Sequence, residues 1–156
     1  MTGKELVVDA YCGSGTIGLW LAPDAREVRG IEVIAEAVED ARRNADASGM
    51  GNCRFYVGQS EALLPDWIKR GERPDVIVVD PPRTGCDRKL LSAVIAAKPR
   101  RFVYVSCNPS TCQGLPGAAG RGLHPRMGAA RRYVSTDFAC GMLRSVGQKL
   151  THRLIL

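Results

Sequence analysis

Residues 5–18 have the sequence ELVVDAYCGSGTIG, and this stretch decides the fold of the chain. Its first part, ELVVDA, is a short apolar run of strand length that carries an acid, Asp9. A glycine-rich turn follows at 12–18, where glycine permits positive φ and lets a ligand approach the backbone closely. Helix-forming residues continue to Leu21, so the free N–H groups of a helix start lie behind the turn. The stretch predicts a strand–turn–helix unit whose turn binds a ligand.

The rest of the first two thirds repeats this alternation of strand and helix patterns. Further strands are expected at 27–32, 53–57, 75–79 and 101–106, and further helices at 35–47, 61–70 and 90–97. Proline cannot continue a central ladder, so Asp80-Pro81-Pro82 ends one strand and Asn108-Pro109 another. Strands and helices that alternate at short spacing are typical of a parallel, doubly wound α/β sheet.

The bulk composition fits one domain of ordinary size. The chain has 156 residues, of which 45% are apolar. It has no run of 18 apolar residues, and its N-terminus, with Lys4 and Glu5, does not resemble a secretory signal. The six cysteines include no CxxC pair and are expected to be reduced thiols rather than metal ligands. We therefore expect a cytoplasmic protein without a membrane span or a metal site.

The net charge of +6 lies entirely in the last part of the chain. Residues 1–112 hold 15 Lys and Arg against 15 Asp and Glu, whereas residues 113–156 hold seven basic residues against Asp137 alone. This tail also has seven glycines and no sustained apolar period, a composition typical of a disordered or unselected segment. The sequence therefore predicts a folded domain at 1–112 and an irregular tail at 113–156.

The glycine turn alone allows two classes of ligand. Gly13, Gly15 and Gly18 satisfy GxGxxG, and Glu32 follows where a ribose-binding acid would stand, so a nicotinamide-dependent oxidoreductase is one interpretation. The acid before the turn, Asp9, and the aromatic within it, Tyr11, instead favour an amine-bearing ligand over a pyrophosphate.

Two further motifs end strands at the same predicted edge, where open α/β sheets bind their ligands. Asp80-Pro81-Pro82-Arg83-Thr84-Gly85-Cys86 supplies an acid and two rigid prolines, which form a shaped polar wall. Ser106-Cys107-Asn108-Pro109 places a thiol beside that wall, and a thiolate is a strong nucleophile that adds to electron-poor carbon.

Together, DAYCGSGTIG, GIE, DPPRTGC and YVSCNPSTC resemble, in order and spacing, the RNA 5-methyluridine methyltransferase family, the bacterial 23S rRNA and tRNA uracil-C5 enzymes. The resemblance covers roughly residues 3–112 and implies a Rossmann-like domain that binds S-adenosylmethionine. It implies the following cofactor-binding residues: Asp9, Tyr11, Gly13, Gly15, Thr16, Glu32, Gln59 and Asp80. Within this set, Glu32 would bind the ribose hydroxyls and Gln59 would lie on the adenine side.

The resemblance also implies a mechanism, in which Cys107 is the nucleophile. Addition of its thiolate to carbon 6 of uracil activates carbon 5, which accepts the methyl group before a general base removes the carbon-5 proton. The expected partner is an RNA with an unstacked target base, 23S rRNA in preference to tRNA. The positive charge of the tail allows another interpretation, in which the chain is a non-catalytic RNA-binding module and the tail is its basic arm. The oligomeric state is not predicted.

The family places its general base in a C-terminal segment similar to DMFPQTxHVE, which this chain lacks. One permitted set of codons for residues 127–142, MGAARRYVSTDFACGM, yields WVQPVDMFPQTLHVE when read one base downstream. Our hypothesis is that the reading frame shifted near the codon for Cys112, so that the tail is an out-of-frame translation. Relatives also carry an RNA-binding β-barrel before the first strand. Without these parts, we expect the chain to be weakly folded and catalytically inactive.

Overall fold

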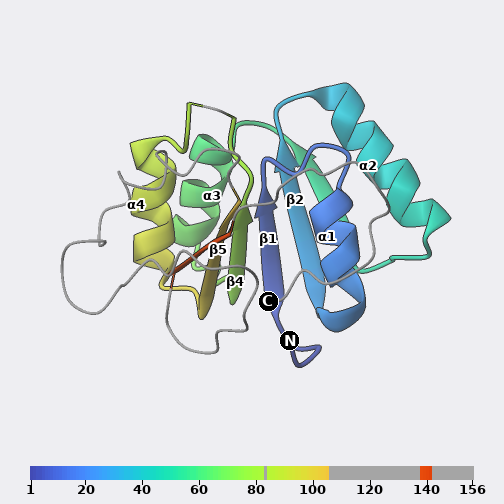
Figure 1. Cartoon of the computed structure of the whole chain (residues 1–156), viewed down its shortest axis with the longest axis horizontal. Coiled ribbons are helices and arrows are strands. Elements are labelled where there is room, and N and C mark those ends of the chain that lie inside the picture. The colour runs from blue at the N-terminus through green and yellow to red at the C-terminus, as the bar shows by residue number, and fades with distance from the viewer. Residues whose placement is uncertain (83, 106–137, 142–156) are drawn as a thin grey trace.

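The computed structural model describes residues 1–82, 84–105 and 138–141. The strands are β1 (Leu6–Ala10), β2 (Glu27–Glu32), β3 (Cys53–Val57), β4 (Val76–Val79), β5 (Arg101–Val105) and β6 (Phe138–Gly141). The helices are α1 (Thr16–Leu21), a 3-10 turn at Ala22–Asp24, α2 (Ala35–Ala47), α3 (Ser60–Lys69) and α4 (Arg88–Ala97). Strands and helices alternate as expected, and β2, β3 and α2 have the expected bounds (Figure 1).

The strands form one parallel sheet in the order β3-β2-β1-β4-β5-β6. The chain winds outward from β1 to β3, returns, and then winds outward in the opposite direction from β4. The strand order therefore reverses between β1 and β4, and the crevice at such a reversal is where open α/β sheets bind ligands. The predicted doubly wound α/β fold is confirmed.

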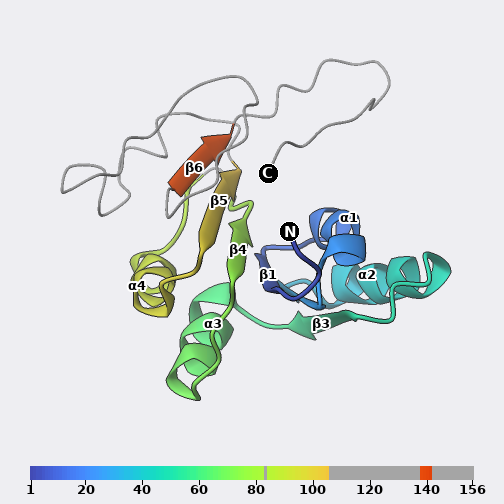
Figure 2. The same ribbon diagram turned by 90° about the horizontal axis from the view of Figure 1, so that it is seen from below.

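Helices cover both faces of the sheet. Figure 2 shows α1 and α2 on one face and α3 and α4 on the other. Two apolar clusters fill the layers: Val7, Val28, Val38 and Phe55 belong to the first, and members of the second include Leu64 and Leu90. All five residues of β1 are buried, as expected for a central parallel strand that is covered on both faces.

The helices are short and amphipathic. The longest, α2, has 13 residues and buries Val38, Ala41 and Ala45, whose spacing places them on one side of the helix. Within the described parts of the chain, no helix has the length and apolar character needed to cross a membrane. The helices thus serve to cover the sheet.

The structure differs from the sequence prediction in the tail, which was expected to hold no regular element. Phe138–Gly141 forms β6 and pairs in parallel with Phe102–Val105 of β5. A sheet edge presents unpaired backbone N–H and C=O groups, and any short extended segment can pair with them through its backbone alone. Strand addition therefore does not need the side-chain periodicity that the tail lacks.

Candidate functional site

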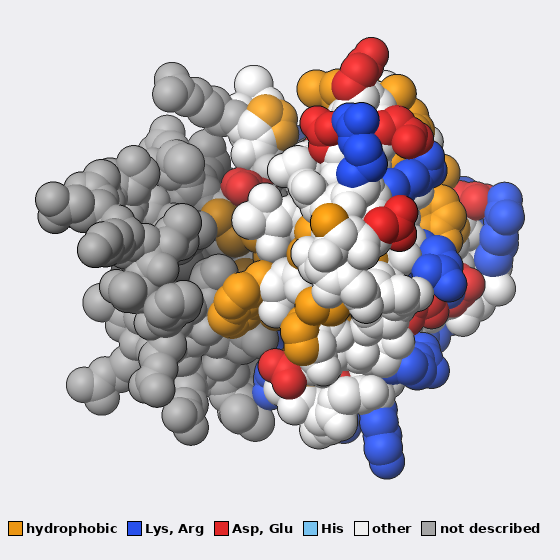
Figure 3. Space-filling model, turned by 90° about the vertical axis from the view of Figure 1, so that its right-hand side faces the viewer, with side chains coloured by type: hydrophobic (Ala, Val, Ile, Leu, Met, Phe, Trp, Pro, Cys, Tyr) orange, Lys and Arg blue, Asp and Glu red, His pale blue; other side chains and the backbone are white. Residues whose placement is uncertain are grey.

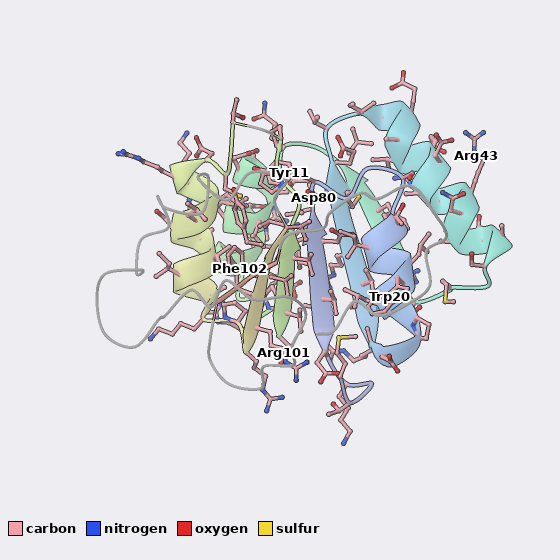
Figure 4. The ribbon with its side chains drawn as sticks, viewed as in Figure 1. Tyr11, Trp20, Arg43, Asp80, Arg101 and Phe102 are labelled. Atoms are coloured by element: carbon pink, nitrogen blue, oxygen red, sulfur yellow. The ribbon has the colours of Figure 1, made fainter. Side chains whose placement is uncertain are left out.

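The described site residues lie at the carboxyl edge of the sheet. The glycine turn follows β1, Glu32 is the last residue of β2, Gln59 lies between β3 and α3, and Asp80 follows β4. Figure 4 shows Tyr11 and Asp80 close together above the ends of β1 and β4, which is the point where the strand order reverses. The structure therefore brings four segments that are separate in the sequence to one edge of the sheet.

The glycine turn has a backbone that few other residues could adopt. Gly13 has a φ of 53° and Gly15 a φ of 84°, both in the left-handed region. A Cβ on Gly15 would lie 3.0 Å from the Phe55 ring and 3.1 Å from the Cβ of Ala41, so the turn packs tightly there. A Cβ on Gly13 would meet nothing within 4 Å. The backbone at Gly13 is therefore open to a ligand while Gly15 anchors the turn.

Glu32, at the end of β2, is oriented by the backbone around it. Its Oε2 accepts a hydrogen bond from Gly13 N at 3.0 Å, and its Oε1 accepts from Val33 N at 2.8 Å and Ile34 N at 3.1 Å. A carboxylate has about four acceptor positions, so about one remains, on Oε2, for a hydroxyl of a ligand. The carboxylate is thus held in place before any ligand binds.

Asp9 lies beneath the turn, with its side chain fully buried. Its Oδ2 accepts a hydrogen bond from Gly18 N at 2.8 Å, so it satisfies a free N–H in the first turn of α1. Its Oδ1 has no hydrogen-bond partner among the described residues. Burial raises the pKa of Asp9 to about 7; the Gly18 hydrogen bond opposes this shift, and the nearby Asp80 adds to it. In this position the side chain supports the first turn of α1, and its contact with the cofactor stays a prediction.

Tyr11 has its backbone in the left-handed region, with a φ of 64°, which is uncommon for a bulky residue. Its side chain packs against the second apolar cluster. Its hydroxyl donates a hydrogen bond to Glu61 on α3. The side chain is half-buried and tied to α3. That its ring packs on the ligand stays a prediction.

The remaining predicted residues are accessible at the crevice or lie outside the described residues. Thr16, at the start of α1, and Gln59, just before α3, are exposed. Asp80 is also exposed, although neighbouring atoms partly desolvate its carboxyl group and raise its pKa. Cys107 lies outside the described residues.

Sequence reasoning missed the apolar side chains beside Glu32. Val33, Ile34 and Val57 are 59%, 56% and 49% exposed, respectively, at the ends of β2 and β3. Large apolar side chains grouped beside fixed polar groups are typical of a ligand pocket. The sequence did contain a signal for this surface: two large apolar residues, Val33 and Ile34, directly follow the acid that ends the strand.

The cysteines of the described region have the properties of unreactive thiols. Burial raises the pKa of Cys12 and, more modestly, that of Cys53, and both side chains are buried. Burial also raises the pKa of Cys86 to about 12, with a further contribution from Glu61. A nucleophilic cysteine needs a lowered pKa, so none of the three is a candidate for the nucleophile.

Comparison with known proteins identifies the family that the first part of the chain matches. Residues 2–113 match a family model described as a methyltransferase domain. Uncharacterized RNA methyltransferases of Halalkalibacterium halodurans and Bacillus cereus are each 62% identical over 111 residues, which is 71% of this chain and 24% of each relative. The chain therefore spans about a quarter of the length of these curated relatives.

A solved structure shows the same arrangement at lower identity. The tRNA (uracil-54, C5)-methyltransferase of Pyrococcus abyssi, in complex with S-adenosyl-L-homocysteine, is 33% identical with a TM-score of 0.60. The match covers 70% of this chain and 26% of that one. These findings do not favour the nicotinamide-dependent oxidoreductase that the glycine turn alone allowed. Since the family model covers more than half of its residues, the chain belongs to the methyltransferase-domain family.

Proposed function

We propose that this chain is the cofactor-binding part of an RNA methyltransferase that methylates carbon 5 of a uridine. The observation that carries the proposal is the placement of the glycine turn, Glu32 and Asp80 at one edge of the sheet, in a chain similar to a tRNA (uracil-54, C5)-methyltransferase. The curated relatives named RNA methyltransferases support RNA as the substrate class. We favour 23S rRNA as the target, with tRNA as the alternative.

S-adenosylmethionine is the cofactor of the domain. The described residues fit it, because the open backbone at Gly13 leaves room for a ligand beside a carboxylate that is already oriented. The free acceptor position of Glu32 suits a ribose hydroxyl. Val33, Ile34 and Val57 offer an apolar surface to a planar base, and Gln59 would lie on its adenine side.

When bound, the cofactor supplies an electrophilic methyl group on a sulfonium. In the proposed reaction, the thiolate of Cys107 forms a bond to carbon 6 of uracil, and the electron pair of the C5=C6 bond moves toward the carbonyl oxygen. Carbon 5 would then bond to the methyl carbon as the methyl–sulfur bond breaks, with S-adenosylhomocysteine as the leaving group. A general base takes the carbon-5 proton, the double bond reforms, and the thiolate leaves. Asp80 would line the pocket that holds the target base.

We further propose that residues 1–112 are the functional domain and that 113–156 are an out-of-frame tail. The match to the family model ends at residue 113, close to the position where the composition changes. The segment expected to supply the general base is absent from the sequence as given. On this proposal the chain binds the cofactor but does not complete methyl transfer, whereas the protein with its frame restored does.

Isothermal titration of the full chain tests the cofactor-binding part of the proposal. S-adenosylhomocysteine should bind, and NAD⁺ should not. Glu32→Ala should weaken binding at least tenfold, because the ribose loses its acceptor and Gly13 N loses its partner. Glu36→Ala, an exposed carboxylate at the start of α2, is the matched control and should bind as the wild type does. Binding of NAD⁺ in place of S-adenosylhomocysteine would refute the proposal.

A further inference from the structure

The crevice is connected to α3 by a hydrogen bond between two residues that lie 50 positions apart in the sequence. The hydroxyl of Tyr11, in the glycine turn, donates to the carboxylate of Glu61, in the first turn of α3. Both side chains are partly buried. Burial and the carboxylate of Glu61 raise the pKa of Tyr11, so the phenol keeps its proton and remains a donor.

This hydrogen bond helps to hold a strained part of the backbone in its conformation. At a φ of 64°, Tyr11 occupies the left-handed region, which is unfavourable for a bulky non-glycine residue. Such a conformation persists only when the surroundings hold it. The side chain packs against the second apolar cluster, and its hydroxyl donates to Glu61.

The backbone next to Tyr11 leads directly to the ligand-binding groups. Cys12 N donates to Ile31 O at 3.0 Å, and Gly13 N donates to Glu32 Oε2 at 3.0 Å. These two bonds attach the turn to β2 on one side of the crevice. The bond from Tyr11 to Glu61 attaches the same turn to α3 on the other side, so the position of Gly13 depends on both attachments.

We propose that Glu61 is a positioning residue of the cofactor site, which acts through the hydroxyl of Tyr11 to hold the glycine turn in its ligand-binding geometry. The proposal rests on the proposed function, because the ligand is S-adenosylmethionine. Glu61 does not touch the ligand in this role. Glu61 keeps Gly13 and Glu32 in their relative positions before the cofactor binds. The loss of the Glu61 carboxylate therefore weakens cofactor binding.

The test is a double-mutant cycle on the full chain, with S-adenosylhomocysteine affinity measured by isothermal titration. Tyr11→Phe and Glu61→Ala should each weaken binding about fivefold, the equivalent of one net hydrogen bond. The double variant should be no weaker than either single variant, because both remove the same bond. Glu61→Gln keeps an acceptor for the hydroxyl and should retain most of the affinity.

A control separates positioning from general stability. Asp66→Ala removes an exposed carboxylate on the same helix, paired there with Arg70 at 2.7 Å, and should leave affinity unchanged. The free energy of unfolding in urea is measured for every variant, and the losses of affinity should exceed any that follow from partial unfolding. Additive losses, wild-type affinity in Glu61→Ala, or an equal loss in Asp66→Ala would each overturn the positioning role. Absence of binding by the wild type would instead overturn the proposed function, and the positioning role with it.

Discussion

Asp9 illustrates at the residue scale how a site residue can act without touching the ligand. A buried carboxyl group normally needs two or more partners, and this one has the N–H of Gly18 only, among the described residues. Because burial disfavours its charged form, its pKa rises from 3.8 to about 7. The group that supports the first turn of α1 is therefore also sensitive to pH.

The stability of the chain should depend on pH through Asp9. Its pKa is higher in the folded chain, so its contribution is fully present below about pH 4 and is lost as the pH rises through about 7. A pKa shift of this size corresponds to a free energy on the order of 4 kcal/mol. Urea unfolding measured from pH 4 to pH 8 should show the free energy of unfolding falling across this window.

Asp9→Asn should remove most of that slope, because the amide keeps an acceptor for Gly18 N but does not titrate. Asp80 also has a raised pKa and contributes in the same direction, so some slope should remain. Asp46→Asn, an exposed carboxyl group on α2, serves as the control and should keep the wild-type slope. An unchanged slope in Asp9→Asn would contradict this account.

At the scale of the element, α4 shows how a side chain sets a helix boundary. The sequence predicted a start at Leu90 from the apolar pattern, but the helix begins at Arg88. Asp87 Oδ1 accepts a hydrogen bond from Lys89 N at 2.7 Å, so the carboxylate caps the helix. Asp is a favoured N-cap residue, and the cap extends the apolar segment by two polar residues, Arg88 and Lys89.

Removing this cap should cost measurable stability. Asp87→Ala leaves the N–H of Lys89 without its acceptor and should lower the free energy of unfolding by about 1 kcal/mol. Asp87→Asn keeps an acceptor and should lose much less. The measurement is chemical unfolding followed by circular dichroism, and equal stability of the Ala and Asn variants would show that the cap contributes nothing.

At the scale of the whole molecule, the charge distribution separates the domain from the tail. Acidic and basic side chains are interspersed on the face that includes α2, as Figure 3 shows, and Arg42 and Arg43 pair there with Glu39 and Asp40. A nucleic-acid-binding module normally has one continuous basic surface. This face of the described domain is therefore not the expected RNA-binding surface of a basic module.

The frameshift hypothesis makes a prediction for the whole protein. Sequencing of the gene across the codons for residues 110–156 should show a change of reading frame near the codon for Cys112, after which the true frame runs one base downstream of the given one. The restored protein should methylate RNA containing the target uridine, measured by transfer of a labelled methyl group, while the chain as given should not. Cys107→Ala in the restored protein should abolish transfer, and Cys53→Ala should not. An intact frame through the tail would refute the hypothesis.

The order of the elements was predictable because it depends on local pattern. Strand-length apolar runs, glycine turns and prolines each act within a few residues, so β2, β3 and α2 were placed with their observed bounds. The carboxyl edge of a parallel sheet then gathers the loops that follow its strands. Glu32 and Asp80 could therefore be assigned to one crevice from the sequence alone.

The sequence by itself determined the α/β class, the strand ends and the residues at the edge of the sheet. Only the tertiary structure decided what those residues do. Asp9 supports α1 because β1 is covered on both faces, and Tyr11 binds Glu61 because α3 crosses back over the sheet from β3 toward β4. Gly30 is required because a Cβ there would lie 2.5 Å from the Phe55 ring on the neighbouring strand. Each of these contacts joins segments far apart in the chain, and local periodicity carries no information about which distant side chains will meet.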